Sequence, residues 1–123
     1  FLNVDIDRIS FYTIDHFIKN AIKLDTFSAN IWIRICLSKY LMLHQYYTLS
    51  LDYLFEAEQI NGNNLYIKEL IIRNYLALNV TTNLTEYVDE FPENYTFIDL
   101  NQEEVDKLYS LYPSRKFKAI AKK

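Results

Sequence analysis

The scarcity of glycine and proline constrains the fold of this chain more than any other feature of its sequence. The 123 residues contain one Gly and two Pro. A β-sandwich or a loop-rich enzyme needs such turn residues about every 8 to 12 positions, whereas helices joined by short polar turns need far fewer. The composition therefore predicts an all-α fold of antiparallel helical hairpins.

The length and hydrophobicity of the chain fit a single globular domain. Half of the 123 residues are hydrophobic, which is enough to build a real core. No apolar run approaches the roughly 18 residues that cross a bilayer, so we expect no transmembrane segment. The sequence begins at Phe1 without a signal-peptide pattern, and we interpret it as a processed or excised part of a longer protein.

Apolar residues at spacings of three and four predict a series of helices. The predicted ranges are 8–24, 29–43, 46–60, 65–78, 83–91 and 102–112. A strand over Ile9–Ile14 is the competing interpretation of the first range. Gly62 lies in the strongest turn signal of the chain, and we expect it to adopt a left-handed or otherwise open conformation after a helix end.

Short polar side chains predict where several of these helices begin. Ser28 is placed to cap the helix over 29–43, and Asn63 or Asn64 is placed to cap the helix over 65–78. Asn101 and Glu104 have the spacing of a capping box. These positions support the helix boundaries that the apolar spacing predicts.

A shift of the sequence by 36 positions aligns it with itself. The segment NAIKLDTFSANIW, which joins the first two predicted helices, then aligns with QINGNNLYI, so the predicted turns coincide. The aligned apolar pairs are Phe11–Tyr47, Phe17–Tyr53, Ile18–Leu54, Ala21–Ala57, Leu24–Ile60, Ile31–Ile67 and Ile35–Ile71. Self-similarity at this period indicates a repeated helix–turn–helix unit.

The pattern resembles the tetratricopeptide repeat. The small, large and alanine positions of that family's second helix match Ser50, Leu54 and Ala57, and in the preceding unit Ile14, Ile18 and Ala21. Trp32 and the pair Ile35-Cys36 match its first helix. The spacing of 36 departs from the usual 34, and the usual proline after the second helix is absent.

The resemblance implies a short tetratricopeptide-like array within one domain over residues 1–112. Its repeat units would span about 8–43 and 46–78, and an atypical C-terminal cap would span 82–112. Residues 113–123 would form a basic C-terminal tail. A non-repeat helical bundle is the alternative fold.

The resemblance also implies a partner-binding groove, because the first helices of tetratricopeptide units line a concave surface that holds peptides or helices. The implied contact residues are Asn30, Ile33, Arg34, Leu37, Tyr40, Tyr66, Glu69 and Arg73. They do not include the set of lysines and asparagines that together clamp a terminal carboxylate in some family members. We therefore expect another protein as the partner, through an apolar helix or extended segment that Arg34 and Arg73 orient. The alternative is that these residues belong to the core.

Charge is distributed unevenly near the C-terminus. Residues 84–106 hold eight acidic residues and no basic one, and residues 107–123 hold six basic residues and no acidic one. The basic residues of the tail are Arg115, Lys116, Lys118, Lys122 and Lys123. They could contact nucleic acid or an anionic surface. The tail itself could form a last helical turn or two. Alternatively the tail folds back onto the acidic stretch.

No group of residues in the sequence points more strongly to catalysis than to an ordinary structural role. The paired carboxylates lie in polar surface runs, and His16 and His44 are not part of a cluster with metal-ligand spacing. Cys36 lies on an apolar helix face, where a buried packing thiol is the expected role. We therefore expect neither an enzyme, nor a small-molecule substrate, nor a cofactor, nor a metal site.

The predicted function is that of a protein-interaction scaffold or adaptor. Its rivals are a nucleic-acid-associated module that uses the basic tail and a structural domain that packs within a parent protein or a homo-oligomer. The compartment stays open, although we favour the cytoplasm. In a secreted eukaryotic protein, the three Asn-x-Thr triplets at Asn79, Asn83 and Asn94 would accept glycans.

Overall fold

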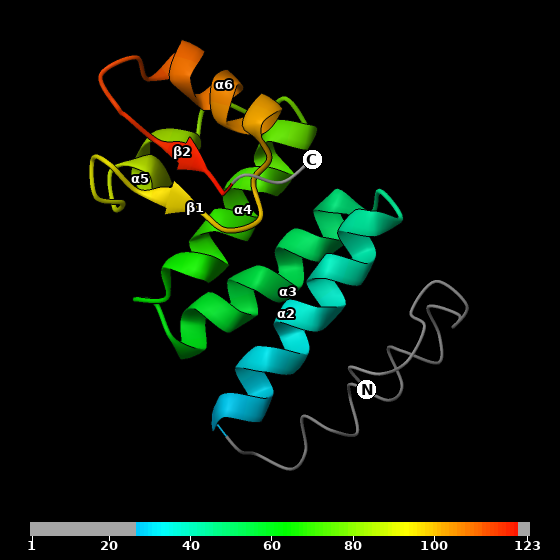
Figure 1. Cartoon of the computed structure of the whole chain (residues 1–123). Helices are drawn as coiled ribbons and strands as arrows, with labels where there is room; N and C mark the ends of the chain where they lie inside the picture. Colours follow the sequence, from blue (N-terminus) through cyan, green and yellow to red (C-terminus); the bar gives the residue numbers. More distant parts are fainter. Residues whose placement is uncertain (1–26, 121–123) are drawn as a thin grey trace. The chain divides into compact units, whose positions relative to one another are not determined.

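The computed structural model describes residues 27–120 (Figure 1). The chain forms two compact units that divide between Gly62 and Asn63. The first unit contains α2 (Phe27–Leu43) and α3 (Tyr47–Ile60). The elements of the second unit are α4 (Leu65–Ala77), α5 (Leu84–Val88), β1 (Thr96–Phe97), α6 (Gln102–Leu111) and β2 (Lys118–Ala119). The predicted all-α class is confirmed, and the predicted helix over 8–24 lies outside the described residues.

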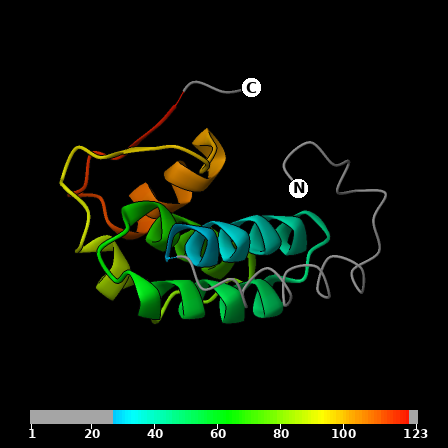
Figure 2. The same cartoon turned by 90° about the horizontal axis from the view of Figure 1, so that it is seen from below.

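Helices α2 and α3 form an antiparallel hairpin, in which they lie side by side in both views (Figures 1 and 2). Small buried residues let the two backbones approach closely. The Ser50 hydroxyl donates a hydrogen bond to the Ser38 carbonyl oxygen across the hairpin at 2.9 Å. Leu41 and Leu54 are completely buried, and burying each such side chain stabilises the fold by about 1.5–3 kcal/mol.

Two helices end in the same backbone motif, which needs a residue in the left-handed conformation. At the end of α2, Gln45 has φ 66°, and the Tyr46 N–H donates to the Leu41 carbonyl oxygen at 2.8 Å. At the end of α4, Asn79 has φ 58°, and the Val80 N–H donates to the Tyr75 carbonyl oxygen at 2.9 Å. These are Schellman motifs, in which the backbone reverses to satisfy the last carbonyl groups of the helix.

Gly62 is not in the left-handed region, because no glycine of the chain has a positive φ. Among the described residues, that conformation belongs to Gln45 and Asn79. The left-handed option for Gly62 was therefore wrong. The turn after α3 therefore does not depend on a backbone conformation that only glycine adopts.

The predicted helix starts are confirmed at two of three positions. The Asn64 side chain accepts the N–H groups of Tyr66 and Ile67 at the start of α4. Asn101 and Glu104 form the predicted capping box at the start of α6. The third predicted position, Ser28, lies within α2 (Phe27–Leu43) and not before its first residue.

The second unit packs α5, α6 and a two-stranded parallel sheet around α4. Its buried apolar side chains include Leu70 and Ile71 of α4, Leu84 of α5, Phe97 of β1 and Leu108 of α6. Strands β1 and β2 pair in parallel, with Thr96 opposite Lys118 and Phe97 opposite Ala119. Each of the two strands is only two residues long.

The predicted helical turn in the C-terminal tail was wrong, because residues 118–119 form a strand. An aromatic cluster accounts for this conformation. Its members are Phe91, Tyr95, Phe97 and Phe117, whose contacting ring centroids lie 4.8 to 6.2 Å apart. Edge-to-face contacts of this kind stabilise by about 0.5–1.5 kcal/mol each beyond the area they bury. Phe117 thus holds the tail in an extended path beside β1.

Candidate interaction surface

The two arginines that were expected to orient a partner are bonded within their own units. Arg34 Nε donates to Glu56 Oε1 at 3.0 Å, which links α2 to α3. Arg34 Nη1 also donates to the carbonyl oxygen and to Oδ1 of Asn30, both at 3.2 Å. Because Glu56 is half-exposed, this ion pair contributes at most about 1 kcal/mol.

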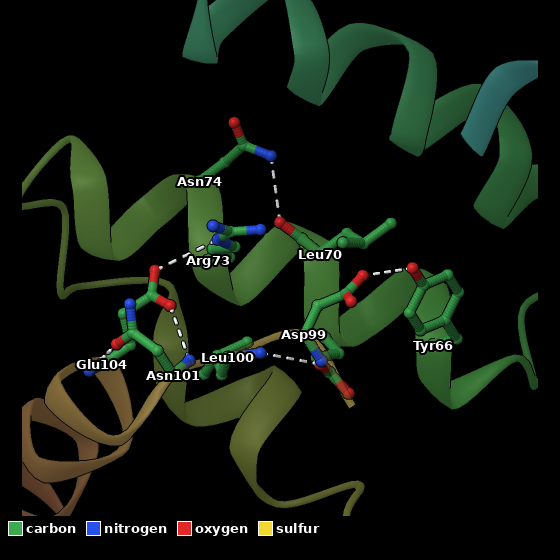
Figure 3. Close-up of polar contacts among 9 residues, drawn as sticks. Tyr66, Leu70, Arg73, Asn74, Asp99, Leu100, Asn101 and Glu104 are labelled. Carbon is green, nitrogen blue, oxygen red and sulfur yellow. Dashed lines mark hydrogen bonds and ion pairs between the residues drawn. The ribbon is translucent and has the colours of Figure 1, made fainter. Parts of the chain in front are cut away.

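Arg73 is bonded in the same way in the second unit. Its Nε donates to Glu104 Oε2 at 3.2 Å (Figure 3). The other carboxylate oxygen of Glu104 accepts the Asn101 N–H at 2.9 Å in the capping box. Arg73 therefore attaches the start of α6 to α4, and its expected role in orienting a partner stays a prediction.

Glu69 is a completely buried carboxylate on α4. It accepts three consecutive backbone N–H groups, from Ile98 at 3.0 Å, from Asp99 and from Leu100 at 3.1 Å. Burial raises the pKa of the Glu69 carboxyl group, and the three N–H donors oppose that rise. Glu69 holds the segment between β1 and α6 and has no surface that a partner could reach.

Tyr66 contributes to the same polar cluster. Its hydroxyl donates to a carboxylate oxygen of Asp99, and Figure 3 shows the two side chains pointing toward each other. Burial, and then the hydrogen bond to Asp99, raise the pKa of the Tyr66 hydroxyl. The cluster of Tyr66, Glu69, Arg73 and Glu104 therefore has a structural role in the second unit.

The remaining predicted groove residues divide between core and surface. Leu37 and Tyr40 are buried, so they cannot contact a partner. Asn30 and Ile33 are half-buried. The two halves of the predicted groove belong to different units, since α2 is in the first and α4 in the second. The alternative that these residues are core holds for Leu37, Tyr40 and Glu69.

The basic tail folds back onto the acidic stretch as far as residue 120. Arg115 Nη2 donates to Asp89 Oδ1 at 2.9 Å, and its Nη1 donates to the Phe91 carbonyl oxygen at 3.4 Å. The backbone N–H groups of Lys116 and Lys118 donate to the carbonyl oxygens of Glu93 and Tyr95, both at 3.1 Å. Lys122 and Lys123 lie outside the described residues.

The closed end of the α2–α3 hairpin exposes large apolar side chains. We call residues 40–51, YLMLHQYYTLSL, the hairpin tip. Leu43 is 62% exposed, Tyr46 is 57% exposed and Leu49 is 37% exposed. The twelve residues of the tip include no Asp, Glu, Lys or Arg. This exposed apolar surface corresponds in the sequence to an uncharged run across a predicted turn, whereas the sequence prediction concentrated on the helix faces.

The backbone of the hairpin tip is fixed by its own hydrogen bonds. The Schellman motif at Gln45 closes the turn, and the Gln45 N–H donates to the Met42 carbonyl oxygen at 3.0 Å. The rings of Tyr40 and His44 are in contact, with centroids 4.6 Å apart. A surface that is already ordered loses little conformational entropy when it binds.

The described residues offer little chemistry for catalysis. Within 27–120, no group of three His, Cys, Asp or Glu side chains is arranged to hold a metal ion. Cys36 is buried, and burial raises the pKa of its thiol although the charge of Lys39 opposes this. A buried thiol that stays protonated is a poor nucleophile.

Of the helices in the described part of the chain, none is both long enough and apolar enough to cross a membrane. Comparisons of the whole chain with protein-family models, with curated proteins and with solved structures give no match in any of the three.

Proposed function

We propose that this chain is a protein-interaction module that binds its partner through the hairpin tip. The observation that carries the proposal is the exposure of Leu43, Tyr46 and Leu49 within a stretch that has no charged residue. The centres of protein interfaces are depleted in charge and enriched in aromatic residues. Tyrosine is also among the residues that most often dominate binding energy.

The composition of the tip argues against ligands that carry phosphate. Nucleic acids and anionic membranes are bound through lysine and arginine, and the tip contains neither. The C-terminal tail does contain lysine and arginine, but its Arg115 forms an ion pair with Asp89. The neighbouring Phe117 packs into the aromatic cluster. A protein surface of apolar, uncharged character is therefore the partner we propose.

We also propose that the hairpin is a tetratricopeptide-like unit. Ser50 and Ala57, which match the small positions of that family, are completely buried and so is Leu54 between them. The two left-handed helix ends, at positions 45 and 79, lie 34 residues apart, which is the length of one tetratricopeptide unit. This spacing supports the resemblance better than the register of 36.

Site-specific crosslinking tests the proposed function. A photoreactive phenylalanine at position 46 is compared with the same group at position 109 in cells of the source organism. Tyr46 and Tyr109 are equally exposed, at 57% each, so exposure alone predicts equal yields. A protein that crosslinks only from position 46 is then purified and its affinity for the chain is measured.

The affinity measurement uses a matched pair of variants. Replacing Leu43 and Tyr46 by serine is expected to weaken binding at least about tenfold, because central apolar residues dominate such interfaces. The control replaces Tyr109 and Leu111 of α6, which are also exposed, and should bind as the unmodified chain does. Equal affinity of both variants would show that the tip is not the binding surface.

A further inference from the structure

We propose that N-linked glycans are attached to Asn79, Asn83 and Asn94, each of which begins an Asn-x-Thr triplet. This modification goes beyond the interaction module and does not depend on the hairpin tip. It implies passage through the secretory pathway of a eukaryotic cell, in place of the cytoplasm that we expected from the sequence. Three features of the second unit support it: the exposure of the triplets, the turns that hold them, and the way the fold uses its other asparagines.

Both ends of every triplet are exposed. The three asparagines are exposed, and so are the three threonines, at positions 81, 85 and 96. The residue between them is more buried in each case, since Leu84 is completely buried and Val80 and Tyr95 are half-buried. A triplet that accepts a glycan belongs on a surface loop, and all three have this setting.

The turns that hold the three asparagines are closed by backbone hydrogen bonds. Asn79 lies in the Schellman motif at the end of α4. Around Asn83, the N–H of residue 84 donates to the carbonyl oxygen of residue 81 at 3.3 Å. Around Asn94, the N–H of residue 95 donates to the carbonyl oxygen of residue 92 at 3.1 Å. The main chain therefore fixes these turns, and a sugar on the side chain leaves their bonds intact.

The side chains of the three triplet asparagines are not used by the fold. The structure shows no hydrogen bond from them to any of the residues it describes, and Asn83 makes no capping bond although it stands at the N-cap of α5. Asn64 and Asn101, which begin no triplet, use their side chains to cap helices. The other described asparagines also have interactions within the chain: Asn30, Asn61, Asn63 and Asn74.

This division separates the asparagines that can carry a sugar from those that cannot without loss. A glycan on a capping or bonded amide would remove a hydrogen bond from the fold. On Asn79, Asn83 or Asn94 it removes none. The sequence pattern and the structure therefore select the same three side chains.

The chemistry of the attachment is a group transfer to the asparagine amide. The side-chain Nδ2 forms a bond to the anomeric carbon of an oligosaccharide. The bond between that carbon and a lipid-linked diphosphate breaks, and Nδ2 gives up one proton as the diphosphate leaves. The lipid-linked oligosaccharide is the co-reactant that the secretory pathway supplies.

The three glycans would all lie on the second unit. Within residues 27–62, no asparagine is followed two positions later by serine or threonine. The part of the first unit that holds the hairpin tip thus has no acceptor among its described residues. Because an attached glycan is bulky and hydrated, it would keep other proteins from the surface around residues 79–96 and leave the tip unmodified.

Mass spectrometry of the natural protein tests the assignment at each position. The protein is isolated from the source organism and treated with peptide N-glycosidase in water enriched in heavy oxygen. The enzyme hydrolyses the side-chain amide, so the nitrogen leaves with the sugar and the resulting aspartate takes its new oxygen from water. Fragment spectra should then show heavy aspartate at positions 79, 83 and 94.

A sample without the enzyme corrects for spontaneous deamidation. Asn61 is prone to this reaction, because the glycine that follows it hinders cyclisation of the side chain least. Ordinary asparagine at all three triplet positions would overturn the proposal, and ordinary asparagine at one of them would overturn it for that position. Either result leaves the proposed function intact, since crosslinking from position 46 tests that separately.

Two neighbouring threonines give a matched control. Thr81→Ala removes the triplet of Asn79, whereas Thr82→Ala, at an equally accessible position, removes none. When each change is made in the natural gene, Thr81→Ala should reduce the mass of the protein by one glycan and Thr82→Ala should not. Asn83→Gln should also remove one glycan without unfolding the second unit, because Asn83 makes no capping bond. Equal glycan content in the two threonine variants would overturn the assignment of Asn79.

Discussion

The Glu69 carboxylate on α4 accepts the backbone N–H of Leu100 at 3.1 Å, although the two residues are 31 positions apart. The same side chain accepts the N–H groups of Ile98 and Asp99. One buried side chain therefore accepts the hydrogen bonds that three consecutive backbone N–H groups would otherwise donate to water. The loop between β1 and α6 depends on it.

Replacing Glu69 should destabilise the second unit strongly. In Glu69→Leu, three N–H groups lose their acceptor, and each unsatisfied buried group costs about 1–3 kcal/mol. We expect a loss of at least about 3 kcal/mol in the free energy of unfolding, since some of the groups regain water. Urea denaturation measures it. The control is Glu93→Gln, an exposed acid, which should change stability by less than about 0.5 kcal/mol.

The stability of the chain should depend on pH through Glu69. Burial raises the folded-state pKa of this carboxyl group above its ordinary value of 4.5, while Asp99 adds to the rise and the N–H donors oppose it. A raised folded pKa means that the folded state favours the protonated form. The contribution of Glu69 to stability is therefore complete below pH 4.5 and is lost as pH rises through the folded pKa.

The measurement compares unfolding free energies of the unmodified chain and of Glu69→Gln, which does not titrate, between acidic and neutral pH. The difference, unmodified chain minus variant, should fall as pH rises. A difference that grows with pH would mean that the three N–H donors outweigh burial and lower the pKa.

Gln45→Gly should stabilise the first unit. Gln45 has φ 66°, a left-handed conformation in which a side chain costs about 1 kcal/mol and glycine costs none. Glycine also makes the unfolded chain more flexible, so the net gain in the free energy of unfolding should be about 0.5 kcal/mol. Thermal unfolding measures the gain. Asn79→Gly should change stability less, because asparagine tolerates this conformation.

Gly62→Ala should be neutral or stabilising, although Gly62 is the single glycine of the chain. Its φ is not positive, and a Cβ atom there would meet the Glu58 carbonyl oxygen at 3.5 Å, an ordinary contact distance. Alanine reduces the flexibility of the unfolded chain, so we expect a gain of about 0.4–1 kcal/mol. A loss of more than about 1 kcal/mol in urea denaturation would show that the turn needs glycine.

The helices were predictable because their signals are local. The apolar spacing gave the ranges of α2, α3, α4 and α6 to within about two residues, which is the usual uncertainty of a helix end. Asn64 and Asn101 cap the residues that follow them within the same turn. Such signals require no knowledge of the rest of the fold.

The features that sequence did not reveal depend on distant partners. Arg34 and Arg73 look like free cations in the sequence, yet each is paired with an acid more than 20 positions away. The strand at Lys118 forms because Phe117 packs against Phe97. The conformation of Gln45 was not predictable either, since glutamine has no preference for the left-handed region.

Glu69 also limits the growth of the small sheet. The carbonyl oxygens of Tyr95 and Phe97 accept the N–H groups of Lys118 and Ile120. The N–H of Ile98, the residue after Phe97, therefore points away from β2, toward the outer edge of β1. An unpaired outer edge is a template for strands of other molecules and hence for aggregation. Because Glu69 already accepts the Ile98 N–H, a strand that approached this edge would find no free donor at that position.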